Sequence, residues 1–182
     1  MAENLAYLPA VSQSSAESAF SPYYYVYDYK DTIVKEAKET VNYTTYGVLY
    51  NGEATKTACP SDWHLPSDVE WQRLEIYLGV SESEVVGIGY HNTGSIGKAL
   101  RSTSGWNENG NGDNSSGFTA IPGGYRSNGG GFRGLGSYAF FWSASEIGSS
   151  NAWGRGLGCH GDGVFPYGDT RSIGFSVRCL QN

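Results

Sequence analysis

The sequence predicts a loop-rich domain of the α+β class. Its 26 glycines, 14 tyrosines and five tryptophans, with only 16% charged residues, are typical of a folded chain with many turns and aromatic packing, and they exclude a disordered chain or a helical bundle. One segment carries clear helix signals, and several short apolar segments lie between turn residues, as strands do. A length of 182 residues fits one domain with a sizeable core.

Residues 1–45 are predicted to form an N-terminal extension packed on a domain that spans residues 46–182. The extension is rich in Ser, Tyr and Ala and has turn signals at Pro9 and Pro22. Its tyrosine-rich stretch, residues 23–29, has strand propensity and is expected to pack against the domain.

The helix signals follow a short predicted strand at residues 46–50 and one or two helical turns at residues 53–58, before Pro60. Ser67 and Glu70 form the S-x-x-E pattern of a capping box, and Gly79 marks the end of that helix. Its core face is formed by Trp71, Leu74 and Leu78.

Beyond Gly79 the predicted elements are short. Residues 95–101 are the better helix candidate between residues 80 and 104, and glycine, asparagine and serine dominate from Gly105 onward. Strands are expected at residues 118–121, 138–144, 152–157 and 173–180.

Charge and hydropathy exclude several classes of partner. A net charge of −6 and the absence of a basic face argue against nucleic-acid binding. No apolar run approaches the length of a membrane span, so direct membrane insertion is not expected. The residues from Met1 onward are not a signal peptide, so the sequence leaves the compartment open, with an export signal removed as one explanation.

The C-terminal segment, residues 151–179, alternates between two kinds of position. Some residues have the spacing of apolar anchors: Trp153, Leu157, Val164, Phe175 and Val177. The residues between them show little turn or packing logic, although glycines alone also occur in irregular loops. This alternation of apolar anchors with residues that have no evident folding role suggests that residues 154–173 form a surface that displays side chains to a ligand.

Six motifs in order indicate a family. They are 46–50 (YGVLY), 58–71 (ACPSDWHLPSDVEW), 104–106 (SGW), 117–126 (GFTAIPGGYR), 141–146 (FWSASE) and 174–179 (GFSVRC). Together they resemble the Fibrobacter succinogenes major paralogous domain of gut Bacteroidetes. That family is similar to C-type lectin-like and formylglycine-generating-enzyme folds, so the resemblance implies two helices beside a small, mostly antiparallel sheet, with long loops.

The resemblance also implies a mechanism of variation. In this family and in other C-type-lectin-fold proteins diversified by retroelements, adenine-directed mutagenesis of asparagine codons randomises the region before the last strand. Such codons never yield Lys, Glu, Gln, Met or Trp, and residues 154–173 contain none of these. By chance, a segment of that length would lack all five residue types roughly one time in twenty. An ordinary family member that drifted is the alternative.

The three cysteines differ in their expected roles. The resemblance implies a disulfide between Cys59 and Cys179, which would stabilise the fold by roughly 4–5 kcal/mol; two buried free thiols are the alternative. Cys159 is left over. Because a formylglycine-generating enzyme needs a reactive cysteine pair, Cys159 is better explained as an accident of diversification.

No cofactor or metal is predicted. His64 is expected to be structural, and no Ser/His/Asp arrangement supports a hydrolase. Residues 107–113 resemble the opening of a calcium loop, but Phe118 stands where the bidentate acid should be, so a solvated loop is favoured over a calcium site. Residues 123–126 and 129–131 precede no helix, so they are predicted to be tight turns and not a phosphate cradle.

These observations predict a non-enzymatic binding module for a protein or glycan ligand at a cell or phage surface, either cell-surface, secreted or on a phage particle. The alternatives are a structural adhesion domain without diversification and, third, a formylglycine-generating-type enzyme. Phe165 and Tyr167 are the expected anchors. The predicted ligand-binding residues are Gly154, Gly156, Gly158, Cys159, His160, Asp162, Phe165, Tyr167, Asp169, Thr170, Ser172 and Ile173.

Overall fold

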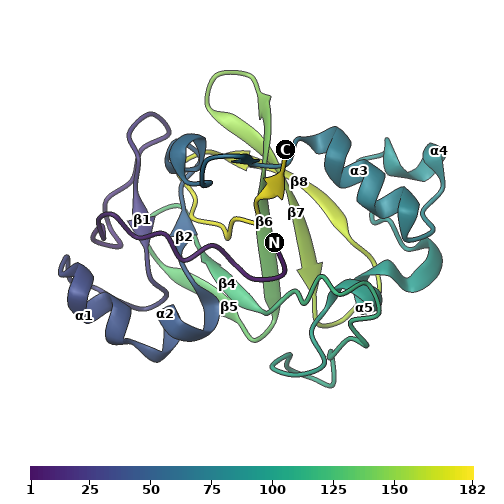
Figure 1. The fold of residues 1–182 in the computed structure, drawn as a ribbon, viewed down its shortest axis with the longest axis horizontal. Coiled ribbons are helices and arrows are strands. Elements are labelled where there is room, and N and C mark those ends of the chain that lie inside the picture. Colours follow the sequence, from purple (N-terminus) through teal and green to yellow (C-terminus); the bar gives the residue numbers. More distant parts are fainter.

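The computed structural model describes residues 1–182 and shows an α+β protein built around a curled, mostly antiparallel sheet (Figure 1). The elements are, in chain order, β1 (Tyr24–Tyr25), α1 (Val34–Glu39), α2 (Val41–Tyr46), β2 (Leu49–Tyr50), a 3₁₀-helix (Ala54–Thr57), β3 (Trp63–His64), α3 (Asp68–Tyr77), α4 (Glu82–Val85), a second 3₁₀-helix (Thr93–Ser95), α5 (Ile96–Leu100), β4 (Gly123–Arg126), β5 (Phe132–Leu135), β6 (Tyr138–Ile147), β7 (Asn151–Gly158), β8 (Phe165–Thr170) and β9 (Leu180–Gln181).

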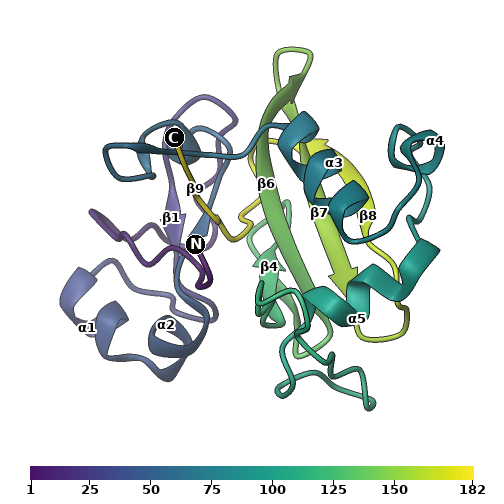
Figure 2. The same cartoon turned by 45° about the vertical axis from the view of Figure 1, so that its right-hand side comes forward.

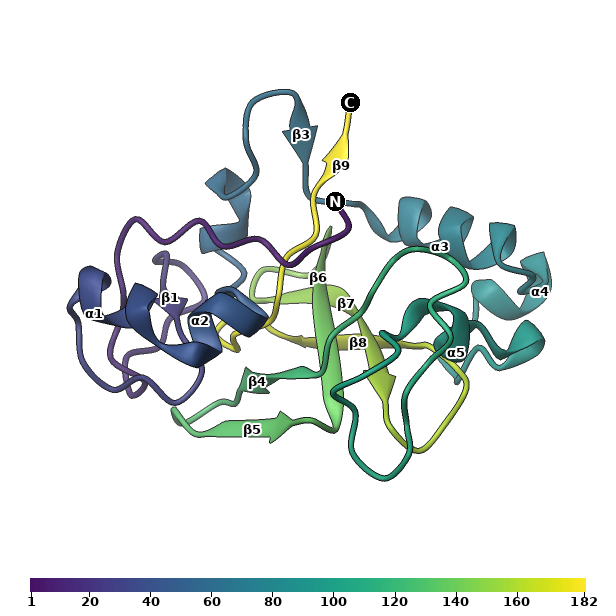
Figure 3. The same ribbon diagram turned by 60° about the horizontal axis from the view of Figure 1, so that its bottom comes forward.

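The central sheet has five strands in the order β5-β4-β6-β7-β8, which makes β8 an edge strand. All neighbours are antiparallel except β4 and β6. Helices α3 and α5 lie on one side of the sheet, and the segment containing β1, α1 and α2 lies on the other (Figure 2). A separate pair, β3 and β9, brings the C-terminus beside residues 63–64 (Figure 3).

The two faces of the sheet bury two hydrophobic clusters. Strand β6 contributes side chains to both clusters, because successive side chains of a strand point to opposite faces of the sheet. Phe140 and Trp142 join the cluster on the N-terminal side. Phe141 joins the cluster under α3, where it packs against Trp71, with ring centroids 5.9 Å apart.

The N-terminal segment contributes side chains to the first cluster. Leu5, Leu8 and Val11 are buried there together with Phe175. The amide of Leu5 donates to the carbonyl of Val177 at 2.9 Å, so the first residues lie beside the last ones. Residues 1–45 are therefore packed into the same core as the rest of the chain.

Helix α3 begins and ends as its sequence predicts. The Ser67 hydroxyl accepts from the Glu70 amide, and the Glu70 carboxylate accepts from the Ser67 amide, which completes the capping box. Gly79 follows with φ +107°, a conformation that favours glycine. The helix at α5 and the helical turns before Ala58 are also confirmed.

Several strand predictions are wrong. Residues 118–121 contain only an isolated bridge, and residues 173–180 form no continuous strand: residues 174–176 pair through single bridges, and β9 begins only at Leu180. Residues 123–126, predicted as a turn, form β4. Gly124 has φ +65°, and a Cβ there would overlap the Arg133 carbonyl of β5, so glycine here allows two strands to approach closely.

A disulfide joins Cys59 to Cys179, with Cα atoms 5.9 Å apart and a sequence separation of 120. This is the pairing that the resemblance implied, and it fixes the last strand to the chain that precedes α3. No helix has the length and apolar character that a membrane span needs.

Candidate ligand-binding surface

Strand β7 places glycines between two aromatic strands. On one face of the ladder Gly156 stands opposite Phe140 of β6 and opposite Phe165 of β8. Gly154 stands in the same way between Trp142 and Tyr167. Because glycine has no side chain, neighbouring rings pack over this face of β7, and both glycines are buried.

The rings of the flanking strands meet over these glycines. The centroid of Phe140 lies 5.6 Å from that of Phe165 and 5.4 Å from that of Tyr167. Phe165 and Tyr167 lie 6.3 Å apart. These distances are typical of favourable aromatic pairs, so the predicted anchors Phe165 and Tyr167 lie close together above the buried glycines of β7.

Two further tyrosines extend this surface. Tyr90 lies 5.1 Å from Phe165, and Tyr138 lies 5.8 Å from Phe140. Their exposed fractions are 58% and 37%, against 38% for Tyr167. Sequence reasoning missed both, because they lie outside residues 154–173. The alternation of β6 gives a signal for Tyr138, which shares a face with Phe140, but nothing in the sequence points to Tyr90. We call Tyr90, Tyr138, Phe165 and Tyr167, with the half-exposed Gly158 of β7, the aromatic–glycine surface.

A small cavity of about 150 Å³ opens at one end of this surface. Tyr90 and Tyr138 line it together with His160. The rest of its lining is glycine: Gly158, Gly161 and Gly163.

The opposite face of β7 is fixed to the helical layer. Arg155 is buried, and its Nε and Nη1 atoms donate to carboxylate oxygens of Glu75 and Asp68 on α3, each at 2.6 Å. Leu157 is buried in the cluster beneath the same helix. These contacts hold the strand without using its glycine face.

The loop that follows β7 is held mainly through its backbone. Buried Arg101 donates from Nη1 to the carbonyl oxygens of Gly158, at 2.9 Å, and Gly161. The Gly97 amide donates to the carbonyl of Asp162 at 2.7 Å. Only one of the Arg101 contacts, an ion pair of 3.0 Å with Asp162, uses a side chain of this loop. Most of these restraints are therefore independent of the side chains that the loop carries.

Seven of the predicted ligand-binding residues are exposed or half-exposed. His160, Asp162 and Tyr167 are exposed. The half-exposed members are Gly158, Phe165, Asp169 and Thr170.

The other five are buried, so they offer a ligand little or no surface. Gly154 and Gly156 lie in the middle of the sheet, and a Cβ on Gly154 would lie 2.7 Å from the Phe141 carbonyl oxygen. Cys159 joins the cluster under α3. Ser172 and Ile173 follow β8 where the chain turns back into the interior.

One of the five apolar residues that were expected to anchor residues 151–179 in the core is less buried than expected. Leu157, Val164, Phe175 and Val177 are buried, but Trp153 is only half-buried. Trp153 stands opposite Gly168 of the edge strand, near the β6–β7 turn that extends beyond α3 (Figure 2). Its truncation is therefore expected to cost less than the roughly 3–5 kcal/mol of a fully buried tryptophan.

The ionisable side chains at the aromatic–glycine surface offer little scope for acid–base or metal chemistry. Burial, and then the adjacent Asp169 carboxylate, raise the pKa of Tyr167 to about 12, so this hydroxyl stays protonated and neutral. His160 Nδ1 lies 3.3 Å from a Glu108 carboxylate oxygen, and both side chains are largely exposed. No group of three or more His, Cys, Asp or Glu side chains has a metal-binding arrangement.

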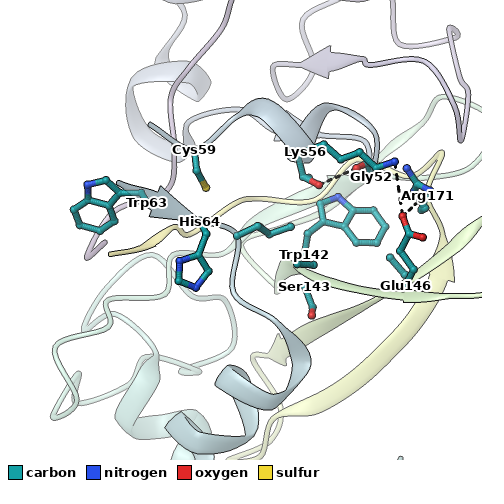
Figure 4. A pocket seen from close by; sticks show the side chains of 13 residues that line it. Gly52, Lys56, Cys59, Trp63, His64, Trp142, Ser143, Glu146 and Arg171 are labelled. Atoms are coloured by element: carbon teal, nitrogen blue, oxygen red, sulfur yellow. Dashed lines mark hydrogen bonds and ion pairs between the residues drawn. The ribbon is translucent and has the colours of Figure 1, made fainter. Parts of the chain in front are cut away.

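A larger cavity of about 330 Å³ lies between β3, the first 3₁₀-helix and β6 (Figure 4). At one end Arg171 pairs with Glu53 and Glu146, and Lys56 contacts the same two carboxylates. His64 lies at the other end, where it bonds to Glu70 at 2.9 Å. Every charge at this cavity has a partner, so the arrangement resembles a structural clamp more than a catalytic site.

Comparisons with curated proteins and with solved structures gave no match. The model of one protein family, described as the Fibrobacter succinogenes major domain, matches residues 1–181. That match covers nearly the whole chain, including both cores and the aromatic–glycine surface. The chain therefore belongs to the Fibrobacter succinogenes major domain family.

Proposed function

We propose that this chain is a non-enzymatic binding module that engages a protein or glycan ligand through its aromatic–glycine surface. The observation that carries the proposal is how residues 154–170 divide into buried side chains that fix the backbone and side chains that reach the surface. Arg155, Leu157 and Val164 are buried beneath the sheet, whereas His160, Tyr167 and Phe165 lie at or near the surface. A fixed backbone that displays aromatic side chains is the physical arrangement of a paratope.

The proposal includes diversification by a retroelement and a C-type lectin-like fold. Support for diversification comes from the residue types of 154–173, which lack the five that adenine mutagenesis of asparagine codons cannot produce. The Arg101 contacts add to this, because backbone carbonyls stay available whatever side chain a mutated codon supplies. The five buried residues, which include two glycines, leave seven exposed or half-exposed residues for display.

We further propose a cell-surface or secreted location, or a phage particle. The Cys59–Cys179 disulfide favours an oxidising environment, where such bonds persist. It also counts against a formylglycine-generating activity, because Cys59 is consumed by the bond and Cys159 is buried and alone.

A structural adhesion domain without diversification remains the second candidate, since the same face would pack on a neighbouring domain. The coding DNA separates the two candidates. Diversification predicts a nearby imperfect repeat of the 154–173 codons that differs only at adenines, beside a reverse transcriptase gene. A locus with neither feature would favour the structural candidate. Binding itself is tested by screening surface proteins and glycans against the purified chain.

A further inference from the structure

We infer that the ligand is a protein, and that the cavity between Tyr90 and Tyr138 receives one of its aromatic side chains, flanked by Lys or Arg. This inference rests on the proposed function and adds a subsite and a ligand class to it. The cavity measures about 150 Å³, close to the size of a cavity that holds one benzene ring. Two tyrosine rings form its walls, and Gly158, Gly161 and Gly163 leave bare backbone between them.

The segment that leads to Tyr90 favours a protein over a glycan. Val86 is 71% exposed and Ile88 81% exposed, and Tyr90 continues the same segment. Aliphatic side chains neither donate nor accept hydrogen bonds, so sugar hydroxyls placed against them would lose water without gaining a partner. The apolar side chains of a protein lose nothing by the same contact.

This apolar segment is held in a fixed position. The amide of His91 donates to the Val164 carbonyl at 2.8 Å, and the Val164 amide donates back at 3.1 Å. The buried His91 ring contacts the Glu75 carboxylate through Nδ1, and its Nε2 lies 3.1 Å from the Gly87 carbonyl oxygen. A backbone fixed before binding reduces the entropic cost of association.

The charges around the cavity are acidic. Glu108 lies beside His160, and Asp162, whose side chain is 56% exposed, follows Gly161. Arg101 is buried under the loop and its ion pair offsets the Asp162 charge in part, whereas the Glu108 carboxylate is 65% exposed. Since the whole chain carries a net charge of −6, a partner with Lys or Arg beside its aromatic residue has the complementary charge.

The test is an NMR titration of the isotope-labelled chain with defined probes. Acetyl-Arg-Phe-Arg-amide is expected to shift the amide resonances of Gly158, Gly161 and Gly163 in a saturable way. Acetyl-Glu-Phe-Glu-amide should bind at least about tenfold more weakly, because it places like charges beside the acidic rim. Acetyl-Arg-Ala-Arg-amide and the methyl glycosides of glucose, galactose and mannose should leave these resonances unchanged.

Two variants and one control locate the site. Gly158→Leu should abolish the shifts by filling the cavity, since its Cβ would lie 3.4 Å from the Tyr138 ring, an ordinary contact. Gly131→Leu is the matched control, with its nearest atom also at 3.4 Å, in Ser127, and it should bind as the wild type does. Tyr90→Ala removes one wall and should weaken binding at least about fivefold.

The outcomes separate this inference from the proposed function. Shifts confined to residues 165–170 would leave the binding surface in place and overturn the subsite. Stronger shifts by a glycoside than by the Arg-Phe-Arg probe would overturn the protein ligand. Shifts that survive Gly158→Leu, or no shifts with any probe, would also overturn the inference. The binding surface itself is decided independently, by alanine variants of Phe165 and Tyr167 tested on a screened ligand.

Discussion

The Phe165 ring fills the space directly above Gly156, its partner in the β7–β8 ladder, so that a Cβ on Gly156 would overlap the ring. The two residues therefore compete for one volume. Gly156→Ala should lower the free energy of unfolding by about 1–3 kcal/mol in the wild type, as overpacking does. In a Phe165→Ala background the same change should cost less than about 0.5 kcal/mol.

Urea unfolding of the four proteins in this double-mutant cycle measures the coupling. Gly161→Ala is the control, because an added Cβ there meets no atom within 4 Å. An equal cost of Gly156→Ala in both backgrounds would show that Phe165 does not occupy this space.

The disulfide gives a second prediction. Replacing Cys59 and Cys179 by serine should lower the free energy of unfolding by about 2–5 kcal/mol, since the bond closes a loop of 120 residues. Dithiothreitol should bring the wild type to the stability of the double variant and leave that variant unchanged. A wild type that is insensitive to the reductant, with the bond shown open by mass spectrometry, would contradict this account.

Arg101 is predicted to hold the loop after β7. Arg101→Lys keeps the charge but loses the planar fork that reaches two carbonyls and a carboxylate. Hydrogen exchange of the Gly97 amide, which donates to the Asp162 carbonyl, should then accelerate about tenfold or more. Arg73→Lys, at an exposed position of α3, should leave this exchange rate unchanged; equal rates in both variants would remove the role of Arg101.

The start of α3 predicts a pH dependence. Hydrogen bonds from Ser67, with a contribution from His64, hold the pKa of Glu70 at about 2, below its ordinary 4.5. This stabilisation is present above pH 4.5 and is lost as the pH falls toward 2. Glu70, followed by Asn182, raises the pKa of His64 above its ordinary 6.5, so that stabilisation is full below pH 6.5 and is lost as the pH rises through the raised value.

Both contributions overlap between pH 4.5 and 6.5. The difference in melting temperature between the wild type and Glu70→Gln should be largest there and smaller on either side. Thermal melts followed by circular dichroism from pH 2 to 9 measure it. Glu39→Gln, at an exposed site, should show no such maximum, and a pH-independent effect of Glu70→Gln would contradict the proposed network.

The sequence predicted features that are encoded locally and missed those set by distant contacts. Helix α3 was found because Ser67, Glu70 and Gly79 carry its start and end signals within one segment. Strand β8 was missed because Pro166 and Gly168 interrupt any strand pattern, and only its pairing with β7 makes it a strand.

The residues of the candidate site also divide into those predicted from local sequence and those missed because distant contacts place them. Phe165 and Tyr167 were predicted because two aromatics separated by one residue share a face of an extended chain. Tyr90 was not, because the pairing of His91 with Val164, far away in the sequence, brings it to the surface. The burial of Gly154 and Gly156 was equally hidden, because the sequence predicts their strand but not the rings of Phe165 and Phe175 that pack over them.

The central claim is that the aromatic–glycine surface binds the ligand. The most direct measurement is the affinity of Phe165→Ala and Tyr167→Ala for a ligand recovered by screening surface proteins and glycans. This account predicts that each variant weakens binding by about 2 kcal/mol or more, roughly thirtyfold, as anchor residues do, while its melting temperature shows that it is still folded. Unchanged affinity in both folded variants would contradict the claim and place the binding site elsewhere.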